Sequence, residues 1–195
     1  MKQVLIIHGG TPFESNRAYL EDLKNKQLKY DRLLYSPDWK TWLGQKLRSW
    51  DVLLPKMPNN ANAQYAEWEI MFSKIVPFLK DDVILIGHSL GAIFLAKYLQ
   101  EHALPIKIKR LILIAAPYDD ESYESLKGFK LSRAKRLADK AKEIHFFQSA
   151  DDPVVNPKEV DKYAADLPDA VIHRFSDRQH FNTPTIPELL KLIKK

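Results

Sequence analysis

The chain has 195 residues, of which 45% are hydrophobic and 28% are charged. This length supplies one well-buried core and is short for two, so we predict a single domain over residues 1–195. The absence of cysteine excludes disulfides and cysteine-based metal sites and favours the reducing cytoplasm. The net charge of +5 comes from 30 basic and 25 acidic residues spread along the chain, which does not indicate a nucleic-acid partner.

The N-terminal stretch MKQVLIIHGG contains one lysine and a short apolar run that ends in glycines. It lacks a small-residue cleavage site, so it is typical of a first β-strand rather than of a signal peptide. No apolar run of the sequence approaches the roughly 20 residues that span a bilayer. We therefore expect a soluble, cytoplasmic protein without a membrane segment.

Six short runs rich in β-branched residues recur along the chain, at Val4–His8, Val52–Leu54, Val83–Gly87, Leu111–Ala115, Ile144–Gln148 and Val171–Phe175. Most are continuously apolar, which is typical of parallel strands buried on both faces. Helical patterns lie between them, most clearly at Leu90–Glu101, Ser132–Lys142, Pro157–Ala165 and Pro187–Lys194. The alternation predicts an α/β fold with a doubly wound, mainly parallel six-stranded sheet, and binding sites beyond the carboxyl ends of its strands.

Two further segments of the sequence have an interpretable pattern. Helical spacing predicts a core-facing helix from Trp39, Trp42, Leu43, Leu47 and Trp50. The basic run Lys130–Lys142 lacks aromatic residues for base stacking, so we interpret it as a solvated helix face rather than a nucleic-acid site.

Gly87-His88-Ser89-Leu90-Gly91 fits the pattern G-x-S-x-G and lies between a predicted strand and a predicted helix. This is the setting of a nucleophile elbow, in which a strained turn exposes a serine hydroxyl. The glycines leave room for the crowded backbone, and the helix N-terminus directs N–H groups at a developing oxyanion.

A serine needs a base to take its proton and an acid to orient that base. The sequence SADDPVVNP follows the fifth predicted strand, and SDRQHFN follows the sixth. The chain order Ser, Asp, His is that of the α/β hydrolases.

The sequence resembles the compact serine hydrolase family of the α/β hydrolases, which includes retinoblastoma-binding protein nine and its small bacterial relatives. The matching segments are IIHGGT, WKTWL, VLLPKMPN, ILIGHSLG, LILIAAP, SADDPVV and QHFN. The resemblance implies that Ser89 is the nucleophile, His180 the general base and Asp152 the acid. It leaves Asp151 open as the acid.

The other open acids are Asp119 and Asp120, after the fourth predicted strand, because some hydrolases supply the acid from there. For the oxyanion hole we expect the N–H of Leu90 and, by resemblance, that of Gly10 rather than of Thr11.

The remaining histidines are assigned structural roles. We expect His8 to shape the loop after the first strand by hydrogen bonding and His88 to be a packing or polar neighbour in the elbow. His102, His145 and His173 lie within or directly after predicted helices or strands, so we expect them to be structural. Their spacing indicates no metal site, and we predict neither a metal nor a cofactor.

Two loops bear on the pocket. Residues Phe13–Tyr35 are longer than the usual link in the family and form either a small lid or a charged helical ornament. The loop Pro55–Gln64 is expected to line the pocket with Met57. The segment between Ala116 and Ile144 is too short for a full cap domain.

The resulting hypothesis is a cofactor-free serine hydrolase that cleaves a small ester, thioester or amide through an acyl-enzyme. Its predicted partner is a small-molecule substrate, and the resemblance leaves room for a protein partner. The rival hypothesis is a non-catalytic protein-binding module that keeps the fold. A weaker one is a nucleic-acid binder that uses the basic run.

Overall fold

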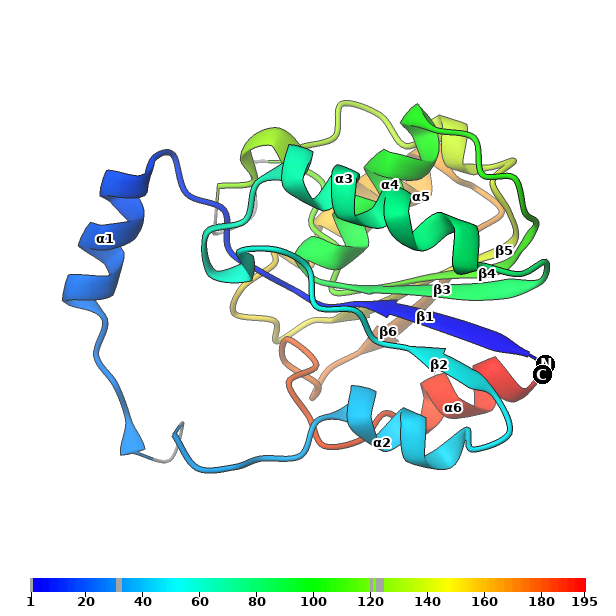
Figure 1. Ribbon diagram of the computed structural model, residues 1–195, viewed down its shortest axis with the longest axis horizontal. Helices are drawn as coiled ribbons and strands as arrows, with labels where there is room; N and C mark the ends of the chain where they lie inside the picture. The colour runs from blue at the N-terminus through cyan, green and yellow to red at the C-terminus, as the bar shows by residue number, and fades with distance from the viewer. Residues whose placement is uncertain (1, 31–32, 120, 122–124) are drawn as a thin grey trace.

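A computed structural model of the chain describes residues 2–30, 33–119, 121 and 125–195 (Figure 1). One six-stranded sheet has the order β2-β1-β3-β4-β5-β6, and every neighbouring pair is parallel. The strands are β1 (Gln3–Ile7), β2 (Asp51–Leu53), β3 (Val83–His88), β4 (Ile108–Ile114), β5 (Ala141–Ser149) and β6 (Val171–Phe175). The helices are α1 (Asn16–Asn25), α2 (Trp39–Lys46), α3 (Tyr65–Ile75), α4 (Leu90–Glu101), α5 (Glu159–Asp166) and α6 (Pro187–Lys194). The predicted doubly wound parallel sheet is confirmed, whereas the assignment to a single domain stays a prediction.

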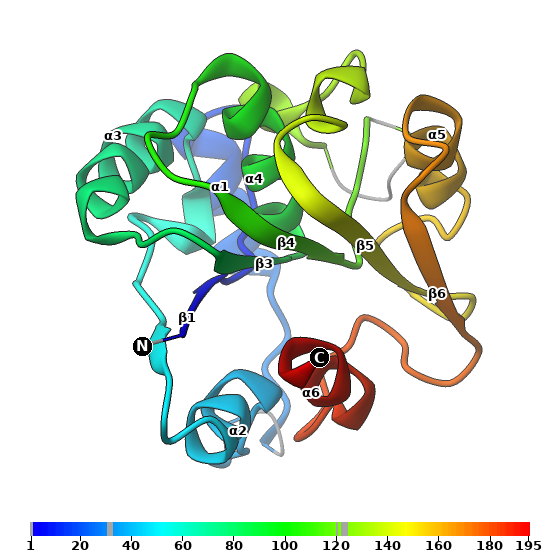
Figure 2. The ribbon, with the colours of Figure 1, turned by 90° about the vertical axis from the view of Figure 1, so that its right-hand side faces the viewer.

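Alternate residues of the strands supply two separate cores. In β1, Leu5 and Ile7 pack into the core that α3, α4 and α5 cover, while Val4 and Ile6 pack into the core that α2 and α6 cover. Figures 1 and 2 show these helices on opposite faces of the sheet. Both faces are therefore buried, which explains why the strands read as continuous apolar runs.

The strand order places a binding region at one end of the sheet. β1 pairs with β2 on one side and with β3 on the other, so the winding direction reverses between β1 and β3. Ligands of open α/β sheets bind beyond the carboxyl ends of the strands at such a reversal. In Figure 1 these ends point toward α1, and both chain termini lie at the opposite end.

The predicted helix Ser132–Lys142 is wrong. A single 3-10 turn at Lys135–Leu137 occupies this stretch, and β5 already begins at Ala141. Leu131, Ala134 and Leu137 are buried at a spacing of three residues, which suits short turns against the core. Ala141 pairs with Ile108 of β4 as the first residue of β5, so the predicted helix cannot extend to Lys142.

The tryptophan segment forms the predicted core-facing helix α2, with Trp39 and Leu43 fully buried. It ends earlier than predicted, at Lys46, so Trp50 lies outside the helix, directly before β2. Trp50 is half-buried and packs against the same core.

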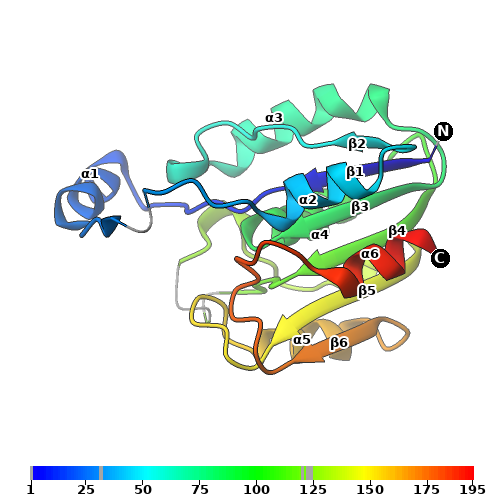
Figure 3. The same cartoon turned by 90° about the horizontal axis from the view of Figure 1, so that it is seen from below.

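The segment predicted as a lid or ornament contains α1, none of whose residues is buried. The helix is held locally, since Ser15 Oγ accepts from the N–H of Ala18 and Arg17 pairs with Glu21. Figures 1 and 3 show α1 projecting from the body beyond the carboxyl ends of the strands.

Across the described residues, no helix has both the length and the apolar character that a bilayer crossing requires.

Candidate active site

Ser89 occupies a strained turn between β3 and α4. Its φ of 55° and ψ of −123° lie in a region that residues with a side chain rarely adopt. Ser89 N–H donates to the carbonyl of Ile114, and its own carbonyl accepts from Ala92. These bonds hold the turn so that it projects the hydroxyl into a cavity beyond the sheet.

The two glycines of the motif are required by space. A Cβ on Gly87 would lie 2.5 Å from the Cα of Ala92, and one on Gly91 would overlap the carbonyl groups of Ile7 and His8. Any side chain at these positions would push α4 away from β1 and β3. The predicted elbow therefore has the expected local structure.

The loop after β1 approaches the elbow closely. A Cβ on Gly9 would lie 3.1 Å from Cβ of Ser89, and one on Gly10 would lie 2.7 Å from the carbonyl oxygen of Asn60. The N–H of Thr11 donates to that same carbonyl, at 2.9 Å, so it is already engaged. This favours Gly10 over Thr11 as an oxyanion donor.

His8 fixes the loop as expected. Its Nε2 accepts from the N–H of Met57 at 2.8 Å, so its Nδ1 carries the proton and donates to the carbonyl of Gly9 at 2.6 Å. Because a trans peptide directs its C=O and N–H to opposite sides, the N–H of Gly10 points away from His8. The other predicted donor, Leu90, is the first residue of α4 and offers an N–H without an acceptor inside the helix.

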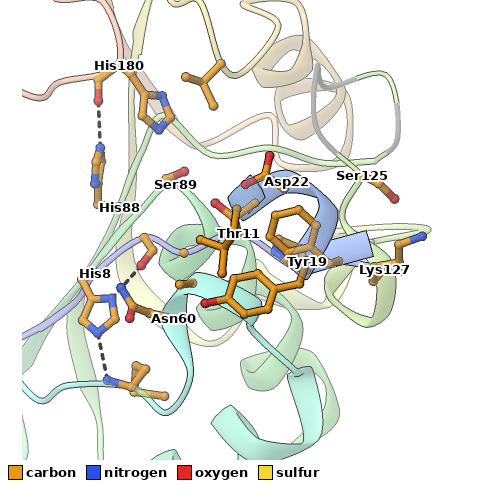
Figure 4. Close-up of a pocket in the computed structure, with 18 of the residues that line it drawn as sticks. His8, Thr11, Tyr19, Asp22, Asn60, His88, Ser89, Ser125, Lys127 and His180 are labelled. Atoms are coloured by element: carbon orange, nitrogen blue, oxygen red, sulfur yellow. Dashed lines mark hydrogen bonds between the residues drawn. The ribbon is translucent and has the colours of Figure 1, made fainter. Parts of the chain in front are cut away.

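His180 lies against Asp152 in a buried contact. Nδ1 of His180 is 3.0 Å from Oδ2 and 3.1 Å from Oδ1 of Asp152. The carboxylate also accepts from the N–H groups of Val154 and Val155, at 2.8 and 3.0 Å. A proton on Nδ1 faces this carboxylate, so Nε2 is left as the acceptor, and Figure 4 shows the ring of His180 directed toward Ser89.

The alternative acids lie in other contacts. Asp151 accepts from Oγ of Ser149 and from the N–H of Gln179, so it braces the loop that carries His180. Asp119 binds Nζ of Lys162 with both carboxylate oxygens, at 2.7 Å. Asp120 lies outside the described residues. The arrangement therefore brings Asp152 alone of the described candidates to His180.

His88 supports the His180 loop from below the elbow. Its Nε2 donates to the carbonyl of His180 at 2.8 Å, and its ring lies perpendicular to that of Trp39 at a centroid distance of 5.9 Å. Burial, with a smaller contribution from Lys40, holds the pKa of His88 well below its usual range. It is therefore a neutral polar neighbour, as predicted.

The loop that carries His180 is also strained. Gln179 and Phe181 on either side have positive φ values of 45° and 54°. Phe181 is fully buried and packs against Phe147 and Phe175, so the core anchors this geometry.

Ser89 and His180 open into a cavity of about 1170 Å³ (Figure 4). The predicted loop contributes Met57 to its wall. α1, from the segment predicted as either a lid or a charged ornament, contributes one face of the cavity wall, with Tyr19 and Asp22 visible in Figure 4. The sequence signal for individual wall residues is the helical spacing of Ala18, Tyr19, Asp22 and Leu23 in α1, and Lys26, directly after the helix, also lines the cavity.

A separate cluster at the far end of α4 groups side chains of metal-ligand type. Ligand atoms of Glu69, Glu101 and His102 lie within 4.8 Å of one another. His102 pairs with Glu69 at 2.7 Å, and Glu101 accepts from the hydroxyl of Tyr65. These contacts give each side chain a structural partner, in agreement with the role predicted for His102.

Comparison with known proteins identifies the family of this chain. The model of the serine hydrolase family matches residues 36–185. The chain is 29% identical over 164 residues to serine hydrolase RBBP9 of Rattus norvegicus, across 80% of this chain and 84% of that protein.

Solved structures share the fold. The ydeN gene product of B. subtilis has a TM-score of 0.77 at 19% identity, covering 100% of this chain and 97% of that one. Est1E of Butyrivibrio proteoclasticus, determined with ferulic acid bound, has a TM-score of 0.59 at 15% identity, covering 100% and 87%. The chain thus belongs to the serine hydrolase family and is a hydrolase with the α/β-hydrolase fold.

Proposed function

We propose that the protein hydrolyses a small ester, thioester or amide through an acyl-enzyme, with Ser89 as nucleophile, His180 as general base and Asp152 as the acid. The observation that carries this proposal is the contact of Nδ1 of His180 with both carboxylate oxygens of Asp152, since His180 lines the same cavity as Ser89 on its strained turn. No cofactor takes part in the proposed reaction.

Acylation begins when Ser89 Oγ attacks the substrate carbonyl carbon and its proton passes to Nε2 of His180. The carbonyl π electrons move to the oxygen, which becomes an oxyanion. When the C–O, C–S or C–N bond breaks, the leaving group takes its electron pair and the proton from Nε2. The products are a free alcohol, thiol or amine and an ester on Ser89.

The proposed oxyanion hole consists of the N–H groups of Leu90 and Gly10. The first comes from the N-terminus of α4, where the helix dipole also favours negative charge. The second is oriented by the peptide whose carbonyl His8 holds. Fixed donors of this kind stabilise the transition state because they need no reorientation as charge develops.

Deacylation repeats the sequence with water. His180 takes a proton from water, the hydroxide oxygen attacks the acyl carbon, and Ser89 Oγ leaves with the proton from Nε2. The Asp152 carboxylate stabilises the imidazolium in both halves. A carboxylic acid is released and the enzyme returns to its starting protonation state.

The first test is labelling with a fluorophosphonate probe, comparing the natural protein with Ser89→Ala. Labelled peptides are mapped by mass spectrometry, and folding of both proteins is checked by circular dichroism. We expect one labelled peptide containing Ser89 and none in the variant. An unlabelled but folded natural protein, or equal labelling of Ser89→Ala, would contradict the proposal.

A further inference from the structure

The wall of the active-site cavity carries more positive than negative charge. Its described lysines are Lys26, Lys40, Lys56 and Lys127, and its described carboxylates are Glu14 and Asp22. Lys127 pairs with Glu14, which removes one charge of each sign. Three lysines then face a single carboxylate, so the described part of the wall favours an anionic ligand.

Lys40 is the most enclosed of these lysines. Its side chain is 13% exposed, compared with 23% for that of Lys127. Its Nζ lies 4.7 Å from the ring centroid of Trp39, a side chain that is itself fully buried. The ammonium group is thus held on a rigid support at the start of α2, rather than on a freely moving surface chain.

The nearest acidic partner leaves part of this ammonium group free. Oδ2 of Asp38 is 3.4 Å from Nζ of Lys40, which is a long contact, while Oδ1 caps α2 by accepting from Thr41 N–H at 2.8 Å. An ammonium group has three donors, so donors remain for a further acceptor. Burial lowers the pKa of Lys40, and Asp38 acts in the opposite direction.

Lys40 is also connected to the proposed catalytic groups. Trp39 beneath it contacts the ring of His88, and His88 donates to the carbonyl of His180. The positive charge of Lys40 helps to keep His88 neutral, after the larger effect of burial. Lys40 is therefore linked to His180 through Trp39 and His88.

We propose that Lys40 forms an anion-binding subsite, and that the substrates of this enzyme are esters, thioesters or amides carrying a negatively charged group such as a carboxylate. This inference rests on the proposed function, because the subsite would hold a substrate in the cavity of Ser89. A charge–charge contact in a partly enclosed site is stronger than in bulk water, since screening by solvent is reduced. Lys40 thereby acts as a specificity determinant.

The experiment compares substrates matched in chain length. p-Nitrophenyl hexanoate is neutral, and mono-p-nitrophenyl adipate carries a carboxylate at the far end of the acyl chain. A second pair, 4-acetoxybenzamide and 4-acetoxybenzoate, places the charge on the leaving group. kcat and KM are measured for each, after subtraction of spontaneous hydrolysis, and the anionic-to-neutral ratio of kcat/KM is calculated for each protein.

We expect the natural protein to prefer the anionic member of at least one pair. In Lys40→Gln that ratio should fall about tenfold, mainly through KM, as expected for the loss of one ion pair worth about 1.4 kcal/mol. Lys40→Arg should keep the preference because it keeps the charge. Lys46→Gln is the matched control, since Lys46 is an exposed lysine of the same helix outside the cavity wall.

Two results overturn the inference in distinguishable ways. If neutral esters are hydrolysed by Ser89 and Lys40→Gln leaves both ratios unchanged, the subsite is refuted while the proposed function stands. If no ester is hydrolysed and no fluorophosphonate labels Ser89, the proposed function fails and the inference fails with it. Folding of each variant is checked by its melting temperature.

Discussion

Asp152 presents both carboxylate oxygens to Nδ1 of His180, at 3.1 and 3.0 Å, while its Oδ1 also accepts from two backbone N–H groups. The backbone hydrogen bonds hold the carboxylate in place independently of its contact with the histidine. The carboxylate favours the tautomer of His180 with its proton on Nδ1, which is the form that the proposed general base needs.

Asp152→Asn should lower kcat by about ten-thousandfold, because an amide at this position favours the wrong tautomer of His180. Hydrolysis of p-nitrophenyl acetate measures the loss, and the melting temperature reports folding. Asp151→Asn is the matched control. Its side-chain oxygen can still accept from Gln179, so its loss should stay below about tenfold. Equal losses in the two variants would contradict the assignment of Asp152.

Gly10→Ala should reduce kcat by about a hundredfold, because the new Cβ would lie 2.7 Å from the carbonyl of Asn60 and displace the loop that carries the proposed oxyanion donor. The control is Gly44→Ala, where a Cβ meets nothing within 4 Å. Gly44 lies within α2, so alanine there should raise stability by about 0.5–1 kcal/mol and leave kcat unchanged. Full turnover by Gly10→Ala would contradict the expected displacement of the loop by the new Cβ.

The elements that the sequence predicts well are those whose signal is local. The strand runs are continuously apolar because both faces of the sheet are covered, and the G-x-S-x-G pattern specifies its turn by backbone crowding alone. The limits of α4 and α6 also agree with prediction, because residues within and next to each helix specify them. By contrast, the stretch Ser132–Lys142 has the composition of a helix but does not form one. Its last residues, from Ala141, belong to β5, which pairs with β4.

The choice between Asp151 and Asp152 depends on contacts that neighbouring positions in a sequence do not reveal. The turn after β5 directs one carboxylate toward His180 and the other toward Ser149 and Gln179. Lys40 is missed for a related reason. Its role comes from the packing of Trp39 against His88, which joins two segments far apart in the chain.

Burial predicts a sharp contrast between two leucines. Leu99 in α4 is 1% exposed and packs in the larger core, so Leu99→Ala should lower the free energy of unfolding by about 2–5 kcal/mol. Leu20 in α1 is 46% exposed, so Leu20→Ala should lower it by at most about 0.5 kcal/mol. Urea unfolding of both variants measures the difference. A large loss in Leu20→Ala would mean that α1 is covered in solution.

The acid sensitivity of folding should depend on Glu143. The two hydrogen bonds from Arg110 outweigh the cost of burial and, with a bond from His145, lower the pKa of Glu143 to about 2. Because this pKa is lower in the folded than in the unfolded chain, the ionised carboxylate contributes stability at neutral pH. That contribution is lost as the pH falls from the ordinary value of 4.5 toward about 2.

Urea midpoints measured at about pH 7 and about pH 3 test this linkage. At neutral pH, Glu143→Gln should have a lower urea midpoint than the natural protein. This difference in midpoint, the stability gap, should narrow at acid pH. The control Glu21→Gln removes a carboxylate from a mostly exposed pair with Arg17, so it should show almost no gap at either pH. A gap for Glu143→Gln that stays constant or widens on acidification would show that its pairing with Arg110 does not contribute to stability.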